Sequence, residues 1–166
     1  MKKLFCLILL SVYLIGCGAA SRMKETVSAP SEIGGMTSAH NGYRSSTGVP
    51  SLTWDNDLAS FAQEWADTLA NRGCDMQHRS NNKYGENLAW ASGQHLSPQD
   101  VVDDWYNEIK DYDYASNSCS GVCGHYTQVV WRDSQRLGCG YASCGNSEIW
   151  VCNYDPPGNY SGQKPY

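Results

Sequence analysis

Positive charge is scarce in this sequence and gathers nowhere. The 166 residues include 12 Lys and Arg against 17 Asp and Glu, for a formal net charge of −5. No window is rich in Lys and Arg, and no aromatic stripe is interleaved with basic residues. A protein that binds nucleic acid needs a basic surface against the phosphates, so we expect no nucleic acid partner, and anionic lipid headgroups are disfavoured as well.

Long apolar runs are also missing. The longest stretch, in residues 4–15, is shorter than the roughly 20 residues that a membrane-spanning helix needs. Lys2 and Lys3 precede it, and Gly16 with other small residues follows it. This order of basic, apolar and small residues predicts a secretory signal peptide in residues 1–16 rather than a membrane span.

The end of that signal decides where the exported protein goes. Leu14-Ile15-Gly16-Cys17 resembles a bacterial lipobox, in which Cys17 is the lipid anchor of a cell-envelope lipoprotein that touches the membrane only through its lipid. The alternative is plain cleavage near residues 18–21 and release of a soluble extracellular protein. Residues 17–35 are polar and small and predict a flexible tether, and residues 36–166 have the length of one domain, expected to be monomeric.

Motifs of common hydrolases and zinc fingers are absent. The sequence contains no HExxH, no GxSxG, no CxxC pair and no Cys/His finger spacing. Of the 8 cysteines, Cys6 lies in the signal and Cys17 in the lipobox, which leaves an even set of six. In an exported domain this number predicts three disulfides rather than a metal finger or a free nucleophile.

Local geometry narrows the 15 pairings that six cysteines allow. Residues 136–143 and 148–154 are β-prone runs around a favoured Gly-Asn turn, and counting outward from that turn places Cys139 opposite Cys152. Two opposed residues of a hairpin can accept a disulfide. Cys119 and Cys123 are close in sequence and most simply pair with each other, which leaves Cys74 with Cys144.

Apolar periodicity predicts four helices. Residues 36–43 form a short one, in which His40 is interpreted as a buried core residue, and a longer helix ends at Gly73. A third begins at residues 97–100, where Ser97 suits the cap, and a fourth covers residues 125–132. The two apolar stripes expected to face the core are Leu58, Phe61, Ala62, Trp65, Ala66 and Leu69 in the second helix, and Val101, Val102, Trp105 and Ile109 in the third.

Two long motifs carry a family resemblance. GHYTQVVWRDS (124–134) and IWVCNYDPPGNY (149–160) resemble the signature motifs of the CAP superfamily, which comprises cysteine-rich secretory proteins, antigen five and plant pathogenesis-related proteins. HNGYR (40–44), GENLAW (85–90) and the six-cysteine pattern extend the match over about residues 36–166, and the plant branch is the most similar. The resemblance implies an α+β fold, a three-layer α/β/α sandwich with the same three disulfides.

The resemblance also implies a binding cleft. Family members commonly carry two histidines and two glutamates there, and the matching positions are His78, Glu86, Glu108 and His125. Imidazoles and carboxylates are good ligands for a divalent metal, with zinc favoured, and an open position would admit water. The same four groups could instead form a hydrogen-bonded network without metal.

Ligand binding is the favoured function, and the ligand implied is a small lipid, such as a sterol or a fatty acid, or a peptide. One segment resembles a sterol-associated loop of some relatives, although its aromatics could equally cap the core; its residues are Asn153, Tyr154, Pro156, Pro157, Gly158, Asn159 and Tyr160. One alternative is a metal-dependent peptidase with Glu86 or Glu108 as general base, although catalysis is not the expected role, and another is a plain extracellular adhesin or defence-like module. No cysteine follows Cys152, so the cysteine-rich extension of the animal ion-channel modulators is missing and their activity is not expected.

Overall fold

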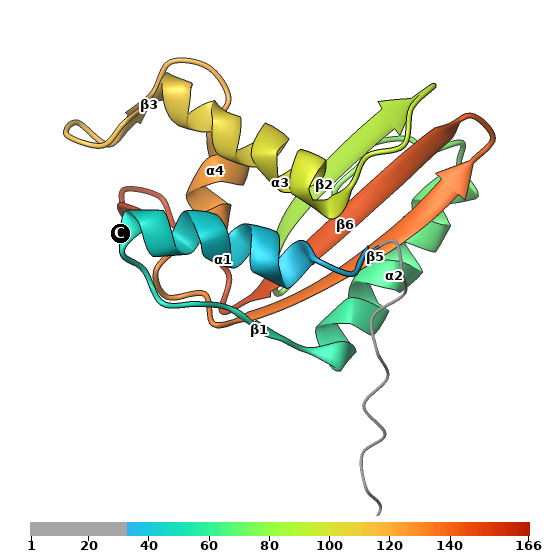
Figure 1. Ribbon diagram of the computed structural model, residues 1–166, viewed down its shortest axis with the longest axis horizontal. Coiled ribbons are helices and arrows are strands. Elements are labelled where there is room, and N and C mark those ends of the chain that lie inside the picture. The colour runs from blue at the N-terminus through green and yellow to red at the C-terminus, as the bar shows by residue number, and fades with distance from the viewer. Residues whose placement is uncertain (1–32) are drawn as a thin grey trace, which may run out of the picture.

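The computed structural model describes residues 33–166, which fold into a sheet between helices (Figure 1). The predicted signal peptide, the anchor Cys17 and most of the predicted tether lie outside the described residues. Along the chain the elements are α1 (Met36–Thr47), β1 (Thr53–Trp54), α2 (Asn56–Ala70), β2 (Gly85–Ser92), α3 (Pro98–Tyr106), the 3₁₀ helix η2 (Asn107–Asp111), β3 (Tyr112–Asp113), β4 (Ser118–Cys119), α4 (Gly124–Val129), β5 (Arg136–Cys144) and β6 (Ser147–Asp155). None of the described helices is long and apolar enough to cross a membrane.

The main sheet has the strand order β1-β5-β6-β2. The β5–β6 hairpin lies at its centre, and β2 pairs antiparallel with β6 along its whole length. Cys139 lies opposite Cys152 in this hairpin and is bonded to it, with the Cα atoms 4.1 Å apart, as the turn geometry predicts. The pairs Cys119–Cys123 and Cys74–Cys144 are also present, so all three predicted disulfides are confirmed.

Helices cover both faces of the sheet, which confirms the three layers (Figure 1). Helix α2 packs on one face through Ala62, Ala66 and Leu69, and α1, α3 and α4 pack on the other around Trp150 and other buried side chains. The α2 contact is close because β5 has glycine there: a Cβ on Gly138 would lie 2.1 Å from the Ala59 nitrogen. The absence of a side chain at Gly138 therefore allows α2 to lie this close to the sheet.

Local signals explain where two helices begin. Asp55 caps α2 by accepting hydrogen bonds from the backbone N–H groups of Asp57 and Leu58. At α3, Ser97 and Asp100 form a capping box and Pro98 occupies the first turn, as the sequence predicts. The Ser97 cap confirms the predicted start of α3, whereas the sequence predicts no start for α2.

The structure corrects several of the predicted boundaries. Helix α2 stops at Ala70 rather than Gly73, α1 runs on to Thr47, and α4 covers only Gly124–Val129. The predicted α3 stripe is right for Val101, Val102 and Trp105 but wrong for Ile109, which is 38% exposed because the chain tightens into η2 after Tyr106. Strand β2 is missed by the sequence reading altogether.

His40 is buried, as predicted, and anchors a polar chain inside the core. Its Nδ1 lies 2.7 Å from the Met36 carbonyl, which only accepts, so Nδ1 carries the proton and Nε2 accepts from the Tyr154 hydroxyl at 2.8 Å. Asn87 Nδ2 then donates to the Tyr154 oxygen and to the His125 carbonyl, both at 3.1 Å. Burial lowers the pKa of His40 to about 4, so the imidazole is neutral near pH 7.

Arg44 is a second buried polar residue that the sequence reading missed. Its guanidinium donates to the carbonyls of Pro50, Val129, Trp131 and Ser134 at 2.7–2.9 Å. Because Val129 ends α4 and Trp131 follows it, one side chain of α1 fixes where α4 ends. This contact holds the helix that carries His125.

Candidate functional site

His125 and Glu108 form the first pair of the predicted site. His125 is the second residue of α4, and its Nδ1 lies 2.6 Å from Glu108 Oε1. The other carboxylate oxygen accepts the backbone N–H groups of His125 at 2.9 Å and Tyr126 at 3.2 Å. Burial acts to raise the pKa of Glu108, but these hydrogen bonds outweigh it and hold the pKa below its ordinary value, so Glu108 stays ionised at the start of α4.

Three contacts fix His125, one on its ring and two on the backbone that carries it. The imidazole stacks on Trp105, with centroids 6.2 Å apart and an interplanar angle of 17°. The preceding Cys123 is bonded to Cys119, and the carbonyl of His125 accepts from Asn87. The side chain is 25% exposed, so it is neither a core residue nor a free surface residue.

His78 and Glu86 form the second pair. His78 lies in the loop between α2 and β2, and its Nδ1 is 2.7 Å from Oε1 of Glu86, the second residue of β2. The side chain of His78 is 63% exposed, whereas that of Glu86 is only 5% exposed. Glu86 also accepts from the Arg79 backbone N–H and the Asn82 amide, both at 3.0 Å, so the carboxylate is fixed before it orients the imidazole.

Arg79 holds this loop against α2. Its guanidinium lies 3.8 Å from the centroid of the Phe61 ring and 5.2 Å from that of Trp65, and it donates to the Phe61 carbonyl at 2.8 Å. This contact also corrects the interpretation of the α2 stripe, because Phe61 and Trp65 are half-buried under Arg79 rather than packed wholly inside. The clamp fixes the position of the neighbouring His78.

The four predicted residues thus meet as two separate His–Glu pairs. Each carboxylate accepts a hydrogen bond from Nδ1 of its histidine. In the neutral imidazole, Nδ1 therefore carries the proton and Nε2 keeps its lone pair. Neither Nε2 atom has a hydrogen-bond partner within the part of the chain that the structure describes. Within residues 33–166 no group of three or more His, Cys, Asp and Glu side chains is arranged to hold a metal ion.

The donor chemistry of the two pairs nevertheless suits a divalent metal. A histidine that binds zinc through one ring nitrogen commonly donates its other ring N–H to a carboxylate, which fixes the tautomer and raises its basicity. Both His78–Glu86 and His125–Glu108 have this arrangement. The residues therefore fit the ligand type, and each pair offers one nitrogen.

The predicted lipid-binding segment is divided by the structure. Asn153 and Tyr154 are buried in β6, whereas Pro156 and Asn159 are exposed and Tyr160 is 50% exposed. The remaining residues, Pro157 and Gly158, are half-buried. Only the part after β6 can therefore contact a ligand directly.

A hollow of about 310 Å³ lies beside that later part of the segment. Its walls include aromatic side chains, hydroxyls and the Cys119–Cys123 bridge; among the lining residues are Tyr112, Thr127, Trp131, Asn159 and Tyr160. Tyr160 and Trp131 lie with their ring centroids 6.1 Å apart. The hollow combines a small aromatic surface with polar edges.

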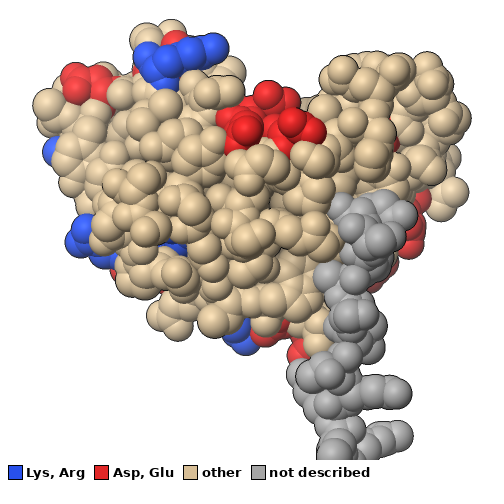
Figure 2. All heavy atoms as spheres, in the orientation of Figure 1, with Lys and Arg blue, Asp and Glu red and all other residues tan. Residues whose placement is uncertain are grey.

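Charge on the visible face is uneven. Figure 2 shows a patch of acidic side chains and only scattered Lys and Arg. Helix α3 carries Asp100, Asp103 and Asp104, and Asp103 accepts a hydrogen bond from the Tyr43 hydroxyl at 2.5 Å. This hydrogen bond, together with burial, raises the pKa of Tyr43 to about 12, so Tyr43 remains a donor.

Known proteins identify the family of this chain. The model of the cysteine-rich secretory protein family, CAP, matches residues 37–154. The chain belongs to the CAP family. It is 53% identical over 129 residues to pathogenesis-related protein 1 of Arabidopsis thaliana, covering 77% of this chain and 78% of the relative.

Two further comparisons place the CAP domain within the family. The chain is 44% identical over 161 residues to a pathogenesis-related protein of PR-1 type from Sambucus nigra, covering 95% of both chains. The solved structure of NaASP2 with Zn²⁺ superposes with a TM-score of 0.70 at 21% identity, covering 86% of this chain and 88% of that chain, which shows the shared fold. The protein is therefore a CAP-domain protein of the PR-1 type.

These relatives also bear on export. The family is described as one of secretory proteins, which agrees with the predicted signal peptide, and we describe the protein as exported. The two relatives named above come from plants, so they give no support to a bacterial cell envelope. Attachment through Cys17 stays a prediction outside the described residues.

Sequence reasoning missed the residues that hold the pairs in place. Asn87, Arg79, Asn82 and Trp105 each contact a member of a pair or its backbone. Asn87 follows Glu86 in the GENLAW motif, which is the one signal that could have pointed to it. Arg79 and Asn82 lie in a loop without periodicity and could be found only from the fold.

Proposed function

We propose that the protein is an exported CAP-domain binding protein whose two His–Glu pairs form a ligand-binding site for a divalent metal, with zinc favoured. The observation that carries this proposal is that both imidazoles are held at Nδ1 by a fixed carboxylate while Nε2 has no partner among the described residues. An imidazole held in this way has its tautomer and its direction set before a ligand arrives, which lowers the entropic cost of binding.

In this proposal His78 and His125 bind through Nε2, and Glu86 and Glu108 hold the protons at Nδ1. A bound zinc ion would act as a Lewis acid toward an oxygen of the ligand. NaASP2, which shares the fold, is described in a structure with Zn²⁺. The histidines do not depend on metal for their placement, because hydrogen bonds already fix both pairs.

The organic ligand proposed is a small lipid, such as a sterol or a fatty acid, or a peptide. Support comes from the hollow beside Trp131 and Tyr160, whose aromatic walls can cover an apolar group while Asn159 and Thr127 offer polar contacts at its edge. Thr127 donates to the Asn159 side chain at 2.7 Å, so these polar groups are already ordered.

Binding is better supported than peptidase activity. A general base works best when its pKa lies near the working pH, and hydrogen bonds lower the pKa of Glu108. Glu86 already accepts from His78, Arg79 and Asn82, so taking a proton from water would cost it one of these contacts. Both carboxylates are better suited to orienting an imidazole than to accepting a proton from a substrate.

Thermal unfolding in the presence of zinc tests the proposal. An ion that binds only the folded protein stabilises it by about 2.7 kcal/mol at 100 times its Kd, so Tm should rise by several degrees. His78→Ala and His125→Ala should each reduce this rise. His95→Ala is the matched control, because His95 forms a pair of the same geometry with Glu148 elsewhere in the fold.

Two results would contradict the metal proposal. One is a Tm of the parent protein that stays constant over the whole zinc titration, and the other is a rise in Tm that all three histidine variants retain. Mass spectrometry of lipids extracted from the purified protein tests the organic ligand separately, and a bound lipid should be lost in Trp131→Ala.

A further inference from the structure

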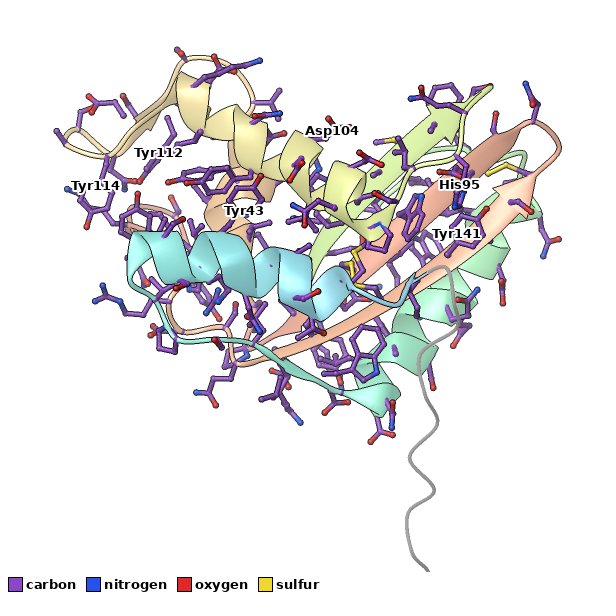
Figure 3. The ribbon with its side chains drawn as sticks, in the orientation of Figure 1. Tyr43, His95, Asp104, Tyr112, Tyr114 and Tyr141 are labelled. Atoms are coloured by element: carbon purple, nitrogen blue, oxygen red, sulfur yellow. A yellow bond between two sulfur atoms is a disulfide. The ribbon has the colours of Figure 1, made fainter. Side chains whose placement is uncertain are left out.

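A third His–Glu pair lies outside the predicted site. His95 is in the loop between β2 and α3, and its Nδ1 lies 2.8 Å from Oε2 of Glu148 in β6. The side chain of His95 is 61% exposed and that of Glu148 only 5% exposed, which closely matches the His78–Glu86 pair. Figure 3 places His95 and Tyr141 side by side near the β5–β6 turn.

This pair is far from the site already described. Glu86 pairs with Asn153 at one end of β2, and Ser92, just before the His95 loop, pairs with Ser147 at the other end. The two positions are six residues apart along the strand, which corresponds to about 20 Å. The two regions cannot share a small ligand.

Glu148 accepts hydrogen bonds from four donors. Its Oε1 accepts from the Leu96 backbone N–H at 2.8 Å and from the Trp150 indole at 3.0 Å, and its Oε2 accepts from His95 and from the Tyr141 hydroxyl at 3.3 Å. Burial acts to raise the pKa of Glu148, but these hydrogen bonds outweigh it and lower the pKa. The carboxylate is therefore ionised and occupied, and it orients His95 without being available to a ligand.

The exposed face of this pair borders a hollow of about 340 Å³. Hydroxyls, two side-chain amides and two rings line it, together with glycine backbone at its edge; the lining includes His95, Tyr141, Ser143, Asn146 and Ser147. The His95 and Tyr141 rings meet edge to face with centroids 5.9 Å apart. The neutral His95 imidazole keeps its Nε2 lone pair as an acceptor, because Nδ1 donates to Glu148.

The charge of the lining restricts the ligand. The residues lining this hollow include no Lys or Arg, so a phosphate or a carboxylate would find no cation there. Only one carboxylate lines it, and its oxygens are already used, so a metal cation lacks a set of ligands. What is left is aromatic surface with hydroxyl and amide groups that both donate and accept.

We propose that this hollow at the β5–β6 turn binds a neutral sugar unit of a glycan, with His95 Nε2 accepting from a sugar hydroxyl and the rings of His95 and Tyr141 packing against its C–H face. Ser143 and Asn146 supply further hydrogen bonds to hydroxyls at the edge. A sugar ring matches this lining because the hydroxyls at its edge both donate and accept hydrogen bonds, one of its faces is apolar, and it carries no charge.

Ligand-observed NMR with a panel of neutral oligosaccharides tests the proposal. The probes are cellohexaose, laminarihexaose, chitohexaose and mannohexaose, and at least one should show saturation transfer from the full-length protein. His95→Ala should weaken that binding about tenfold, which corresponds to the loss of one well-made hydrogen bond and part of the ring surface. His78→Ala, at the matched pair, should leave it within about twofold of the parent's Kd.

Ser143→Trp is a second variant that tests the location of binding even if His95→Ala loosens the loop that carries His95. Ser143 is exposed, and although it lies opposite Glu148 in the β5–β6 ladder, its hydroxyl is not among the donors to that carboxylate, so the larger side chain should fill the hollow and abolish binding without lowering Tm. Absence of transfer with all four oligosaccharides overturns the proposal. Binding that survives both His95→Ala and Ser143→Trp overturns the location.

Discussion

Acid should destabilise this protein through His40 before it protonates the structural carboxylates. The folded protein holds the imidazole neutral in the core, and burial lowers its pKa from 6.5 to about 4. The unfolded chain therefore binds a proton at a higher pH than the folded protein does. Stability from this residue is complete above pH 6.5 and is lost as the pH falls toward 4.

The size of the effect follows from the shift in pKa. Each unit is equivalent to about 1.4 kcal/mol, so the full shift is worth about 3 kcal/mol. Between about pH 7.5 and about pH 5, roughly 2 kcal/mol of this should be lost. Such a loss is a large fraction of the ordinary stability of a domain.

Urea unfolding at a series of pH values measures it, with His40→Gln as the comparison. Glutamine does not titrate, and it can still bond the Met36 carbonyl and the Tyr154 hydroxyl. The variant should be less stable at neutral pH but lose about 2 kcal/mol less than the parent over the same pH range. Equal losses in the two proteins would refute the reasoning, because carboxylates that titrate in this range are common to both.

Three further predictions concern other positions. Arg44→Met removes one donor from each of four carbonyls and should lower the free energy of unfolding by at least about 4 kcal/mol, measured by urea unfolding; a loss under about 1 kcal/mol would contradict the assigned role. Gly138→Ala places a Cβ 2.1 Å from the Ala59 nitrogen and should cost about 2 kcal/mol or more, whereas Gly42→Ala, with no atom within 4 Å, should cost nothing; similar Tm values for both variants would be the contrary result. If Cys17 is the anchor, a fatty-acid analogue should label the parent but not Cys17→Ser, and equal release of both proteins into the medium would exclude it.

The hairpin could be predicted from the sequence because its determinants are local. A Gly-Asn turn sets the register, and the register places Cys139 opposite Cys152. The α3 start could be predicted for the same reason, since Ser97, Pro98 and Asp100 act within one helical turn. The family resemblance then supplied the His78, Glu86, Glu108 and His125 positions, which spacing alone could not connect.

Features that depend on distant contacts were beyond the sequence. Strand β2 carries buried Asn87 and exposed Trp90 in one strand, so neither alternation nor an apolar run marks it. Arg44 is buried only because the chain after α4 presents its carbonyls to it, and Ile109 turns outward only because η2 follows α3. The division of the site into two pairs likewise depends on where loop and strand meet in space.

The strand order has a consequence for how the chain can acquire its structure during synthesis. The two central strands, β5 and β6, are also the last two in sequence, so helices and edge strands made earlier have no sheet to pack on until Asp155 has been added. Two of the three disulfides likewise require a cysteine from this late hairpin. Many domains begin to fold while their N-terminal part emerges from the ribosome. Here the early elements lack the central strands that they pack on, and the contacts with those strands close long loops. The topology therefore delays folding of the nascent polypeptide until the β5–β6 hairpin has been made, and an unfolded chain is the state that a translocation channel accepts.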